Sequence, residues 1–291
     1  MMRHEDIEIR SLGGTSFDEI ARAFMEAFAD YGIDFDEAKI RDMFVRRGAR
    51  PDLSFAAFSG DRIVSFIING IGRYGGTTAA YDTGTGTVPD FRGRRLTGAI
   101  FEYSQGRLAE AGIGTYVLEV LCDNTPAVKI YRGQGFEETR VQDCYAGDVS
   151  AVLAHMDSRG AAGITLREDS VAGIANLAGF LDFEPSWQNA PESLMRNPGA
   201  FDCLVAYEGC IPVGFGVSET AYGDISLLAV DRSRRRRGIG SALLRELARR
   251  SRPGTVKVLN IDTGCRDMKA FMAASGLDFT CSQYEMRKRM T

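Results

Sequence analysis

One order of segments occurs twice along the chain, and this repeat limits the sequence to folds made of two copies of one unit. Each copy begins with a short alternating strand, continues through a hairpin and a basic turn, and ends on a glycine followed by an apolar residue. The corresponding ranges are 7–10 with 164–167, 57–66 with 206–215, 92–97 with 235–240, and 133–136 with 274–277. Four correspondences in the same order predict two related domains.

The length of the chain agrees with this division. At 291 residues it is long for one domain and sufficient for two. Serine, alanine and glycine accumulate between the two copies, which indicates a connecting segment. We therefore expect a first domain at 1–146, a linker at 147–163 and a second domain at 164–291.

The most informative local signal is a strand, a basic glycine turn and a helix in the second copy. Residues 225–230 form an apolar run of strand length, Arg234–Arg237 follow, and apolar residues recur at helical spacing over 239–247. The start of such a helix exposes N–H groups at the positive end of its dipole, where anions bind. Gly238 and Gly240 let the backbone approach a phosphate closely. The pattern indicates a pyrophosphate cradle, with a solvated arginine-rich helix cap as the alternative.

This turn and a segment of the first copy carry the signatures of one family. Arg235–Gly240 matches R/Q-x-x-G-x-G/A, and Asn124–Phe136 matches N-x-x-A-x-x-x-Y-x-x-x-G-F. The sequence therefore resembles the GNAT superfamily of acyl-CoA-dependent N-acyltransferases, in two GNAT-like copies. The resemblance implies an α/β (mixed α+β) fold with two GNAT domains, each a splayed, mixed, mostly antiparallel sheet flanked by helices. It also implies that the loop holds the pyrophosphate of coenzyme A and that acyl-CoA enters the splay.

The first copy contains candidate acid and base groups. Glu119 lies in the apolar strand 116–121, where an ionised carboxylate must be paired or have a raised pKa. Such a group beside a cleft can act as a general base, and a salt-bridged structural carboxylate is the alternative. Asp82 is a second candidate base, or else a turn or substrate-binding residue. The resemblance implies that Tyr131 protonates the departing thiolate, unless it is a core aromatic, and that Asn124 contacts the pantetheine arm or the cofactor backbone.

The second copy lacks these groups. The same register puts Asn260 in the place of Glu119 and Met272 in the place of Tyr131. An amide is not a useful proton acceptor, and a thioether has no proton to donate. We therefore expect the first domain to be catalytic and the second to keep a phosphate loop without acid–base chemistry.

The phosphate loop of the first copy departs from the signature. Arg95 and Thr97 stand where glycines are usual. If residue 95 has a positive φ, arginine costs about 1 kcal/mol there, although three arginines at a helix start still favour a phosphate. The resemblance implies that backbone N–H groups around Thr87 and Val88 hold the acyl carbonyl, as in an oxyanion hole. The predicted cofactor-binding residues are Thr87, Val88, Arg92, Gly93, Arg94, Arg95, Leu96, Thr97 and Asn124 in the first copy, and Ala229, Val230, Arg235, Arg236, Arg237, Gly238, Ile239, Gly240 and Ser241 in the second.

The composition argues against several other classes of protein. A net charge of −4 and a pI of about 5.4 disfavour a nucleic-acid binder. Because His4 and His155 are the only histidines, we expect neither a histidine triad nor a metal site. Six cysteines without a C-x-x-C pair indicate reduced thiols. The first residues lack an apolar signal core, and no run approaches the ~20 residues of a membrane helix, so we expect a cytoplasmic protein with no membrane partner.

Together these features predict an N-acetyltransferase that moves an acetyl group from acetyl-CoA to a primary amine of a small molecule or peptide, by direct attack in a ternary complex. The alternative is a non-catalytic acyl-CoA-binding sensor or scaffold. The sequence predicts helices over 17–31 and 36–47. Phe24, Phe28 and Tyr31 are expected in the core, although the resemblance implies that these first helices form the wall of the acceptor site. Trp187 falls in the matching wall of the second copy, as a ligand contact or an interdomain plug. We expect a monomer or a homodimer.

Overall fold

The computed structural model describes residues 7–30, 32, 35–156 and 161–290, which form two compact units. Of these residues, unit 1 contains those up to Val120, Asn124–Thr139 and those from Met286 onward. Unit 2 contains Leu121–Asp123 and Arg140–Glu285. The last residues of the chain therefore belong to the unit formed by its first residues. The predicted linker at 147–163 contains a helix, α5 (Val149–Met156), and its residues 157–160 lie outside the described residues.

Two capped helices follow the first strand of unit 1. Helix α1 (Phe17–Phe28) begins with a capping box in which Ser16 and Glu19 bond to each other's backbone N–H. Helix α2 (Glu37–Arg47) begins at Asp36, whose side chain accepts from the N–H of Lys39 at 2.7 Å. Both helices were predicted from the sequence, and α1 ends three residues earlier than the predicted Phe17–Tyr31 helix. Tyr31 itself lies outside the described residues.

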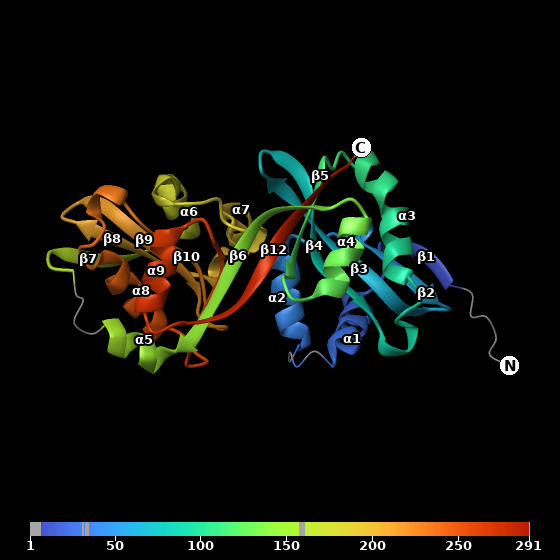
Figure 1. Ribbon diagram of the computed structural model, residues 1–291, viewed down its shortest axis with the longest axis horizontal. Helices are drawn as coiled ribbons and strands as arrows, with labels where there is room; N and C mark the ends of the chain where they lie inside the picture. The colour runs from blue at the N-terminus through green and yellow to red at the C-terminus, as the bar shows by residue number, and fades with distance from the viewer. Residues whose placement is uncertain (1–6, 31, 33–34, 157–160, 291) are drawn as a thin grey trace. The chain divides into compact units, whose positions relative to one another are not determined.

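In the sheet of unit 1, β4 (Thr77–Thr87) and β5 (Thr115–Leu121) run parallel, whereas the earlier strands pair antiparallel with one another and with β4. Helices α3 (Leu96–Glu110) and α4 (Thr125–Gly133) follow these two strands in the sequence. Just after β12 (Asp278–Arg289), the N–H of Met290 donates to the carbonyl of Gly114 at 3.0 Å, which ties the end of the chain to the start of β5. The strands lie in the order β1 (Ile7–Ser11), β2 (Phe55–Ser59), β3 (Arg62–Tyr74), β4 (Thr77–Thr87) and β5 (Thr115–Leu121) (Figure 1).

Two glycines let α1 pack closely on this sheet. A Cβ on Gly84 would lie 2.6 Å from Cε2 of Phe24, and one on Gly86 would lie 2.7 Å from Cζ of Phe66. Phe24 is buried, and its ring centroid lies 4.7 Å from that of Phe28 and 5.6 Å from that of Phe66. With a side chain at either glycine, the rings of Phe24 and Phe66 would have to move. Phe24 and Phe28 belong to the core cluster of unit 1.

Unit 2 repeats this plan with shorter helices before its hairpin. Its strands lie in the order β12, β6 (Glu137–Asp148), β11 (Thr255–Asp262), β10 (Asp224–Val230), β9 (Ile211–Glu219), β8 (Asp202–Glu208) and β7 (Ile164–Asp169) (Figure 1). Its helices after α5 are α6 (Val171–Ile174), α7 (Pro191–Met195), α8 (Ile239–Arg249) and α9 (Arg266–Ala274), with 3₁₀ turns that include Trp187–Asn189. The apolar face of α8 supplies Ile239, Leu243 and Leu247 to the core.

Both sheets open between their two parallel strands. In unit 1, β4 and β5 pair only from Ala79 to Tyr81 against Thr115 to Val117. In unit 2, β10 and β11 pair only at two positions, Asp224 with Lys257 and Ile225 with Val258. Beyond these residues the parallel strands are no longer paired. Each unit thus has the splayed, mostly antiparallel sheet that the sequence predicted.

Candidate active site

The candidate catalytic residues of unit 1 lie just past the last paired residues of β4 and β5. Asp82 follows Tyr81 on β4, and Glu119 lies two residues after Val117 on β5. A shift in the β3–β4 register makes Thr83 an extra residue in β4. Nη1 of Arg47, from the end of α2, donates to the carbonyl of Thr83 at 2.9 Å. The bulge and the splay therefore place Asp82 where the sheet opens.

Asp82 combines a buried oxygen with two hydrogen bonds. Its Oδ2 accepts from Oγ1 of Thr85 at 2.7 Å and from the hydroxyl of Tyr131 at 3.4 Å. The residue is half-buried overall, but its Oδ1 is sealed from solvent and has no hydrogen-bond partner among the described residues. Burial raises the pKa of Asp82 to about 6, against the lowering effects of Thr85, Tyr131 and the charge of Arg47. A carboxyl group with this pKa is suited to proton transfer near neutral pH.

Glu119 has a different neighbour. Its carboxylate shares a hydrogen bond with the hydroxyl of Tyr81, a fully buried side chain of β4. Burial, followed by the charge of Glu119, raises the pKa of Tyr81 well above its ordinary value. The structure thus brings Tyr131 together with Asp82, whereas Glu119 is engaged by Tyr81. Tyr81 and Thr85 had not been singled out in the sequence, which offered no signal for them beyond their closeness to Asp82.

Helix α4 carries Tyr131 and is fixed at both ends. Its N-cap is Asn124, whose Oδ1 accepts from the N–H of Ala127 at 3.3 Å. At its other end, Nζ of Lys288 donates to the carbonyl of Gln134 at 2.6 Å. The ring of Tyr131 packs edge-on against Phe136, with centroids 5.7 Å apart. Asn124 therefore acts in the structure as a helix cap, and the Tyr131 hydroxyl is held at the splay by its helix.

The phosphate loop of unit 1 leads directly into α3. Gly93 has a φ of 77°, and the N-cap residue Arg95 has a φ of 59°. The condition under which the sequence predicted strain at Arg95 is therefore met. The first bond of the helix runs from the N–H of Ala99 to the carbonyl of Arg95 at 3.2 Å, so the three N–H groups at Leu96, Thr97 and Gly98 have no partner within the helix.

Two predicted cofactor contacts of unit 1 are engaged by the protein itself. Arg92 forms an ion pair with Asp30, and its Nε donates to the carbonyl of Thr87 at 3.2 Å. The N–H of Val88 donates to the carbonyl of Val64 at 3.0 Å. Arg92 thus clamps the loop to the end of β4, and the Val88 N–H is occupied within the sheet. Arg94 lies over the ring of Phe91, 4.4 Å from its centroid, and Arg95 is exposed.

The loop of unit 2 has positive φ angles at the same two positions as the loop of unit 1, but glycine and arginine have changed places. Arg236 has a φ of 62°, and the N-cap Gly238 has a φ of 80°. Arg235 repeats the clamp of Arg92, because its Nε donates to the carbonyl of Val230 at 3.1 Å and its Nη2 pairs with Asp182 at 2.9 Å. Neither acidic clamp partner, Asp30 or Asp182, was identified from the sequence. No short-range pattern marks them.

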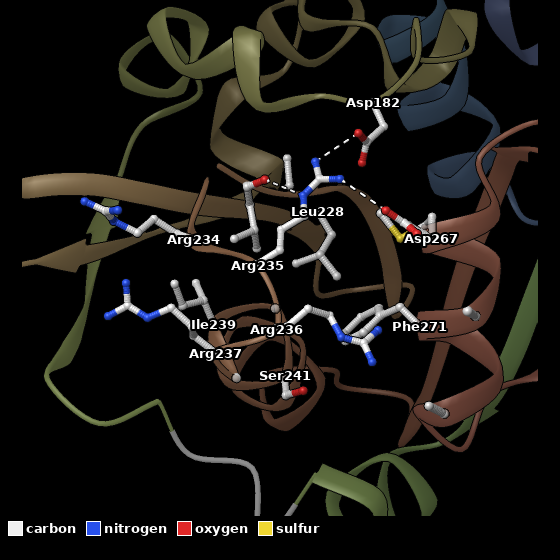
Figure 2. Close-up of a pocket in the computed structure, with 17 residues that line it drawn as sticks. Asp182, Leu228, Arg234, Arg235, Arg236, Arg237, Ile239, Ser241, Asp267 and Phe271 are labelled. Atoms are coloured by element: carbon white, nitrogen blue, oxygen red, sulfur yellow. Dashed lines mark hydrogen bonds and ion pairs between the residues drawn. The ribbon is translucent and has the colours of Figure 1, made fainter. Parts of the chain in front are cut away.

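This second loop forms one wall of a cavity of about 580 Å³ (Figure 2). Arg237 forms an ion pair with Glu208, whereas the exposed Arg236 has no partner among the described residues. Figure 2 shows the side chain of Arg236 extending toward Phe271 on α9. Every residue that the sequence assigned to the cofactor in the second copy lines the cavity, together with Asp182, Leu228, Arg234, Asp267, Met268, Ala270, Phe271 and Ala274.

The positions of the catalytic groups are filled differently in unit 2. Counting back from each loop, Ile225 corresponds to Asp82, and it belongs to the core cluster with Met272. Asn260 is buried with a φ of 65°; its Nδ2 donates to Oγ of Ser186 at 3.0 Å, and its Oδ1 accepts from Gln283 at 3.1 Å. The space between β10 and β11 is reduced to a cavity of about 40 Å³. The described residues of unit 2 present no acid–base pair there.

The described residues contain neither a metal-binding cluster nor a membrane-spanning helix. Within the ranges that the structure covers, no three His, Cys, Asp or Glu side chains are grouped so that they could hold a metal ion. In the same ranges, no helix has the length and apolar character needed to cross a bilayer.

Comparison with solved structures shows the fold over the whole chain. A tandem GNAT protein from the clavulanic acid biosynthesis pathway is 15% identical with a TM-score of 0.72, covering 98% of this chain and 99% of that one. A GCN5-related N-acetyltransferase from Sphaerobacter thermophilus is 16% identical with a TM-score of 0.69, covering 100% and 97%. A glucosamine N-acetyltransferase region of a fungal multi-domain β-N-acetylglucosaminidase is 13% identical with a TM-score of 0.71, covering 99% of this chain and 38% of that one.

Comparison of the sequence with family models identifies each half separately. The Acetyltransferase (GNAT) family matches residues 17–136, and the Acetyltransferase (GNAT) domain matches residues 199–271. No protein with a curated description matches the sequence. The first match contains the Asp82 and Tyr131 pair, and the second contains the loop around Gly238. The chain is therefore a tandem member of the GNAT acetyltransferase superfamily, with one GNAT domain in each half of its sequence.

Proposed function

We propose that unit 1 is an N-acetyltransferase that moves an acetyl group from acetyl-CoA to a primary amine in a ternary complex. The observation that carries the proposal is the hydrogen bond from the hydroxyl of Tyr131 to Oδ2 of Asp82. It joins a proton donor to an acceptor whose pKa is about 6, at the point where β4 and β5 separate. The pair therefore unites a proton donor and a proton acceptor, the two kinds of group that acyl transfer to an amine requires.

The residues present fit a cofactor with a diphosphate group. Leu96, Thr97 and Gly98 offer helix N-terminal N–H groups in unit 1, and Gly238–Ser241 line the arginine-rich cavity of unit 2. Acetyl-CoA, when bound, supplies an activated thioester. Arg92 and Arg235 hold the shape of their loops through Asp30 and Asp182, so we assign them to positioning the loop rather than to direct contact with phosphate.

Proton transfer in unit 1 follows from the geometry of the pair. The ionised Asp82 takes a proton from the attacking amine, directly or through water. Tyr131 gives its hydroxyl proton to the sulfur that leaves. Because Tyr131 already donates to Oδ2 of Asp82, the proton gained by Asp82 can restore the tyrosine across the same hydrogen bond. Glu119, which is engaged by Tyr81, is the alternative base.

Thiol release from acetyl-CoA with a panel of amines tests this proposal. One similar structure is described as a glucosamine N-acetyltransferase region, so amino sugars belong in the panel beside polyamines and peptide N-termini. We expect release that depends on one class of amine and is lost in Asp82→Asn. If no amine releases thiol from folded protein that binds acetyl-CoA, unit 1 is a binding module instead.

For unit 2 we propose cofactor binding without turnover. Its cavity at the loop is open, but Ile225, Asn260 and Met272 occupy the places of Asp82, Glu119 and Tyr131. The alternative function, a non-catalytic sensor or scaffold, is thereby proposed for unit 2 alone. The two roles separate by mutation, because each loop can be altered independently of the other.

A further inference from the structure

The segment Leu181–Asn189 of unit 2, here called the closing segment, lies between the loop cavity and the end of the parallel strands. Leu181, Asp182, Phe183, Pro185 and Asn189 from this segment line the cavity of about 40 Å³ whose other walls are β10 and β11. Asp182 also lines the cavity of about 580 Å³ at the phosphate loop. The cavity between the parallel strands, where a splayed sheet would admit an acyl group, thus has less than a tenth of the volume of the cavity at the loop.

The closing segment is anchored by buried hydrogen bonds on the strand it covers. Nδ2 of Asn260 donates to Oγ of Ser186 at 3.0 Å, and Nδ2 of Asn189 donates to the carbonyl of Leu259 at 3.2 Å. Ser186, Asn189 and Asn260 are all buried. Opening the segment would break these buried hydrogen bonds, which opposes its displacement by a ligand.

A second set of contacts fixes the segment from its outer side. Nη1 of Arg140 donates to the carbonyl of Glu184 at 2.5 Å, and its Nη2 donates to the carbonyl of Pro185 at 3.4 Å. Trp187 is only 2% exposed, and its carbonyl accepts from Oγ of Ser193 at 2.6 Å. Trp187 is therefore a core residue of unit 2.

The loop end of the cavity has the opposite character. Arg236 is exposed and has no partner among the described residues, and the N–H groups of Ile239, Gly240 and Ser241 at the start of α8 have no partner within the helix. The cavity itself is lined by Arg234–Arg237. These arginines and N–H groups can bind a diphosphate whatever group the other end of the ligand carries.

From these contacts we infer that unit 2 is a binding site for the adenosine diphosphate end of coenzyme A that is closed to the acyl end. The inference rests on the proposed cofactor binding of unit 2. Unit 2 recognises free coenzyme A, acetyl-CoA and the pantetheine-free 3′-phosphoadenosine diphosphate through the same contacts. It therefore responds to the total coenzyme A pool and not to its acetylation, and its ligand is never a substrate.

Calorimetric titration of the full chain with these three ligands tests the inference. The site of unit 2 is identified as the one lost in Arg236→Glu, with Arg249→Glu on the exposed side of α8 as the matched charge-reversal control. For that site we expect affinities for coenzyme A and acetyl-CoA within about twofold of each other, and an affinity for the pantetheine-free ligand within about tenfold. A site that binds acetyl-CoA more than tenfold tighter than coenzyme A, or no site that depends on Arg236, would overturn the inference.

Plain ADP and NAD serve as further ligands that separate coenzyme A from other adenosine diphosphates. Tighter binding of either one than of coenzyme A would also overturn the inference.

Hydrogen exchange of the wild-type chain provides a readout that does not depend on a variant. The backbone amides of residues 183–190 should exchange at the same rate with acetyl-CoA as with coenzyme A. Faster exchange in acetyl-CoA alone would mean that the acyl group opens the closing segment, which contradicts the inference. Failure of the proposed catalysis looks different, because it appears as absent thiol release while the calorimetric pattern of unit 2 persists.

Discussion

The hydroxyl of Tyr131 donates a hydrogen bond to Oδ2 of Asp82 across 3.4 Å, although 49 residues separate the two in the sequence. Tyr131 is carried by a capped helix, and Asp82 lies beside a bulge in a strand whose parallel partner diverges from it. The pair joins a proton donor to an acceptor poised near neutral pH at the opening of a sheet.

Tyr131→Phe should lower kcat by about 100-fold or more, the range in which removal of a general acid falls. The affinity for acetyl-CoA should stay within about twofold, because the hydroxyl bonds to Asp82 and not to the phosphate loop. Steady-state thiol release and calorimetry measure the two quantities. Tyr103→Phe removes the same group from α3, where the ring packs edge-on against Phe55, and should change neither. An unchanged kcat in Tyr131→Phe would exclude the tyrosine from the chemistry.

Asp82 should set the acidic limb of the pH profile. With a pKa of about 6, the carboxyl group is ionised and able to accept a proton above that pH, so kcat/KM should fall about tenfold per pH unit below it. Asp82→Asn should be slow at every pH. Glu119→Gln is the matched variant on β5, and its kcat/KM should still fall below about pH 6. Loss of the limb in Glu119→Gln with retention in Asp82→Asn would assign the base to Glu119.

The same pKa makes Asp82 a source of instability above neutral pH. The folded pKa of about 6 exceeds the ordinary value of 3.8, so between these values the folded chain holds a proton that the unfolded chain has released. Ionisation therefore costs folding free energy as the pH rises through this window, by up to roughly 3 kcal/mol. Urea unfolding of Asp82→Asn should show a stability gain over wild type that is small at pH 4 and full above pH 7. A gain independent of pH would show that ionisation is not its cause.

Arg95→Gly should stabilise unit 1 by about 1 kcal/mol, because the N-cap of α3 has a φ of 59° that a glycine adopts without strain. Arg94→Gly is the matched control one residue earlier, where φ is not positive, and it should bring no gain. In unit 2 the reverse change, Gly238→Ala at a φ of 80°, should cost a similar amount. Thermal unfolding of the three variants checks the set, and equal shifts in Arg95→Gly and Arg94→Gly would contradict it.

Gly84→Ala should destabilise unit 1 by several kcal/mol, since its Cβ would lie 2.6 Å from the buried ring of Phe24. Gly106→Ala, in the interior of α3 with nothing within 4 Å of the added Cβ, should stabilise by up to about 1 kcal/mol. Chemical denaturation measures both. A tolerated Gly84→Ala would mean that α1 can move away from β4 at little cost.

The sequence was sufficient where a feature depends on neighbouring residues. The strand, turn and helix around Gly238 could be predicted because the glycines, arginines and apolar spacing lie within about twenty residues of one another. The replacement of Glu119 and Tyr131 by Asn260 and Met272 in unit 2 could be found from the register between the two copies alone. The splayed sheet came from the resemblance, and the short pairing of β4 with β5 and of β10 with β11 bears it out.

Contacts between distant segments could not be predicted from the sequence. Asp30 and Arg92 are 62 residues apart, and nothing in the spacing marks Asp30 as the partner of that arginine. The choice between Asp82 and Glu119 depends on which one Tyr131 and Tyr81 reach, and side-chain direction beside a bulge does not follow from a strand pattern. The closing segment was also hidden, because Ser186, Trp187 and Asn189 lie where the two copies differ most.

The last residues of the chain have a consequence for how the protein is made. Residues from Met286 onward belong to unit 1, and Lys288 holds the end of the helix that carries Tyr131. Ribosomes synthesise these residues after all of unit 2, so unit 1 can be completed only after unit 2 has been made. Until then, the start of β5 lacks the bond that Met290 gives to Gly114. The activity proposed for unit 1 therefore depends on residues that are synthesised after the second domain.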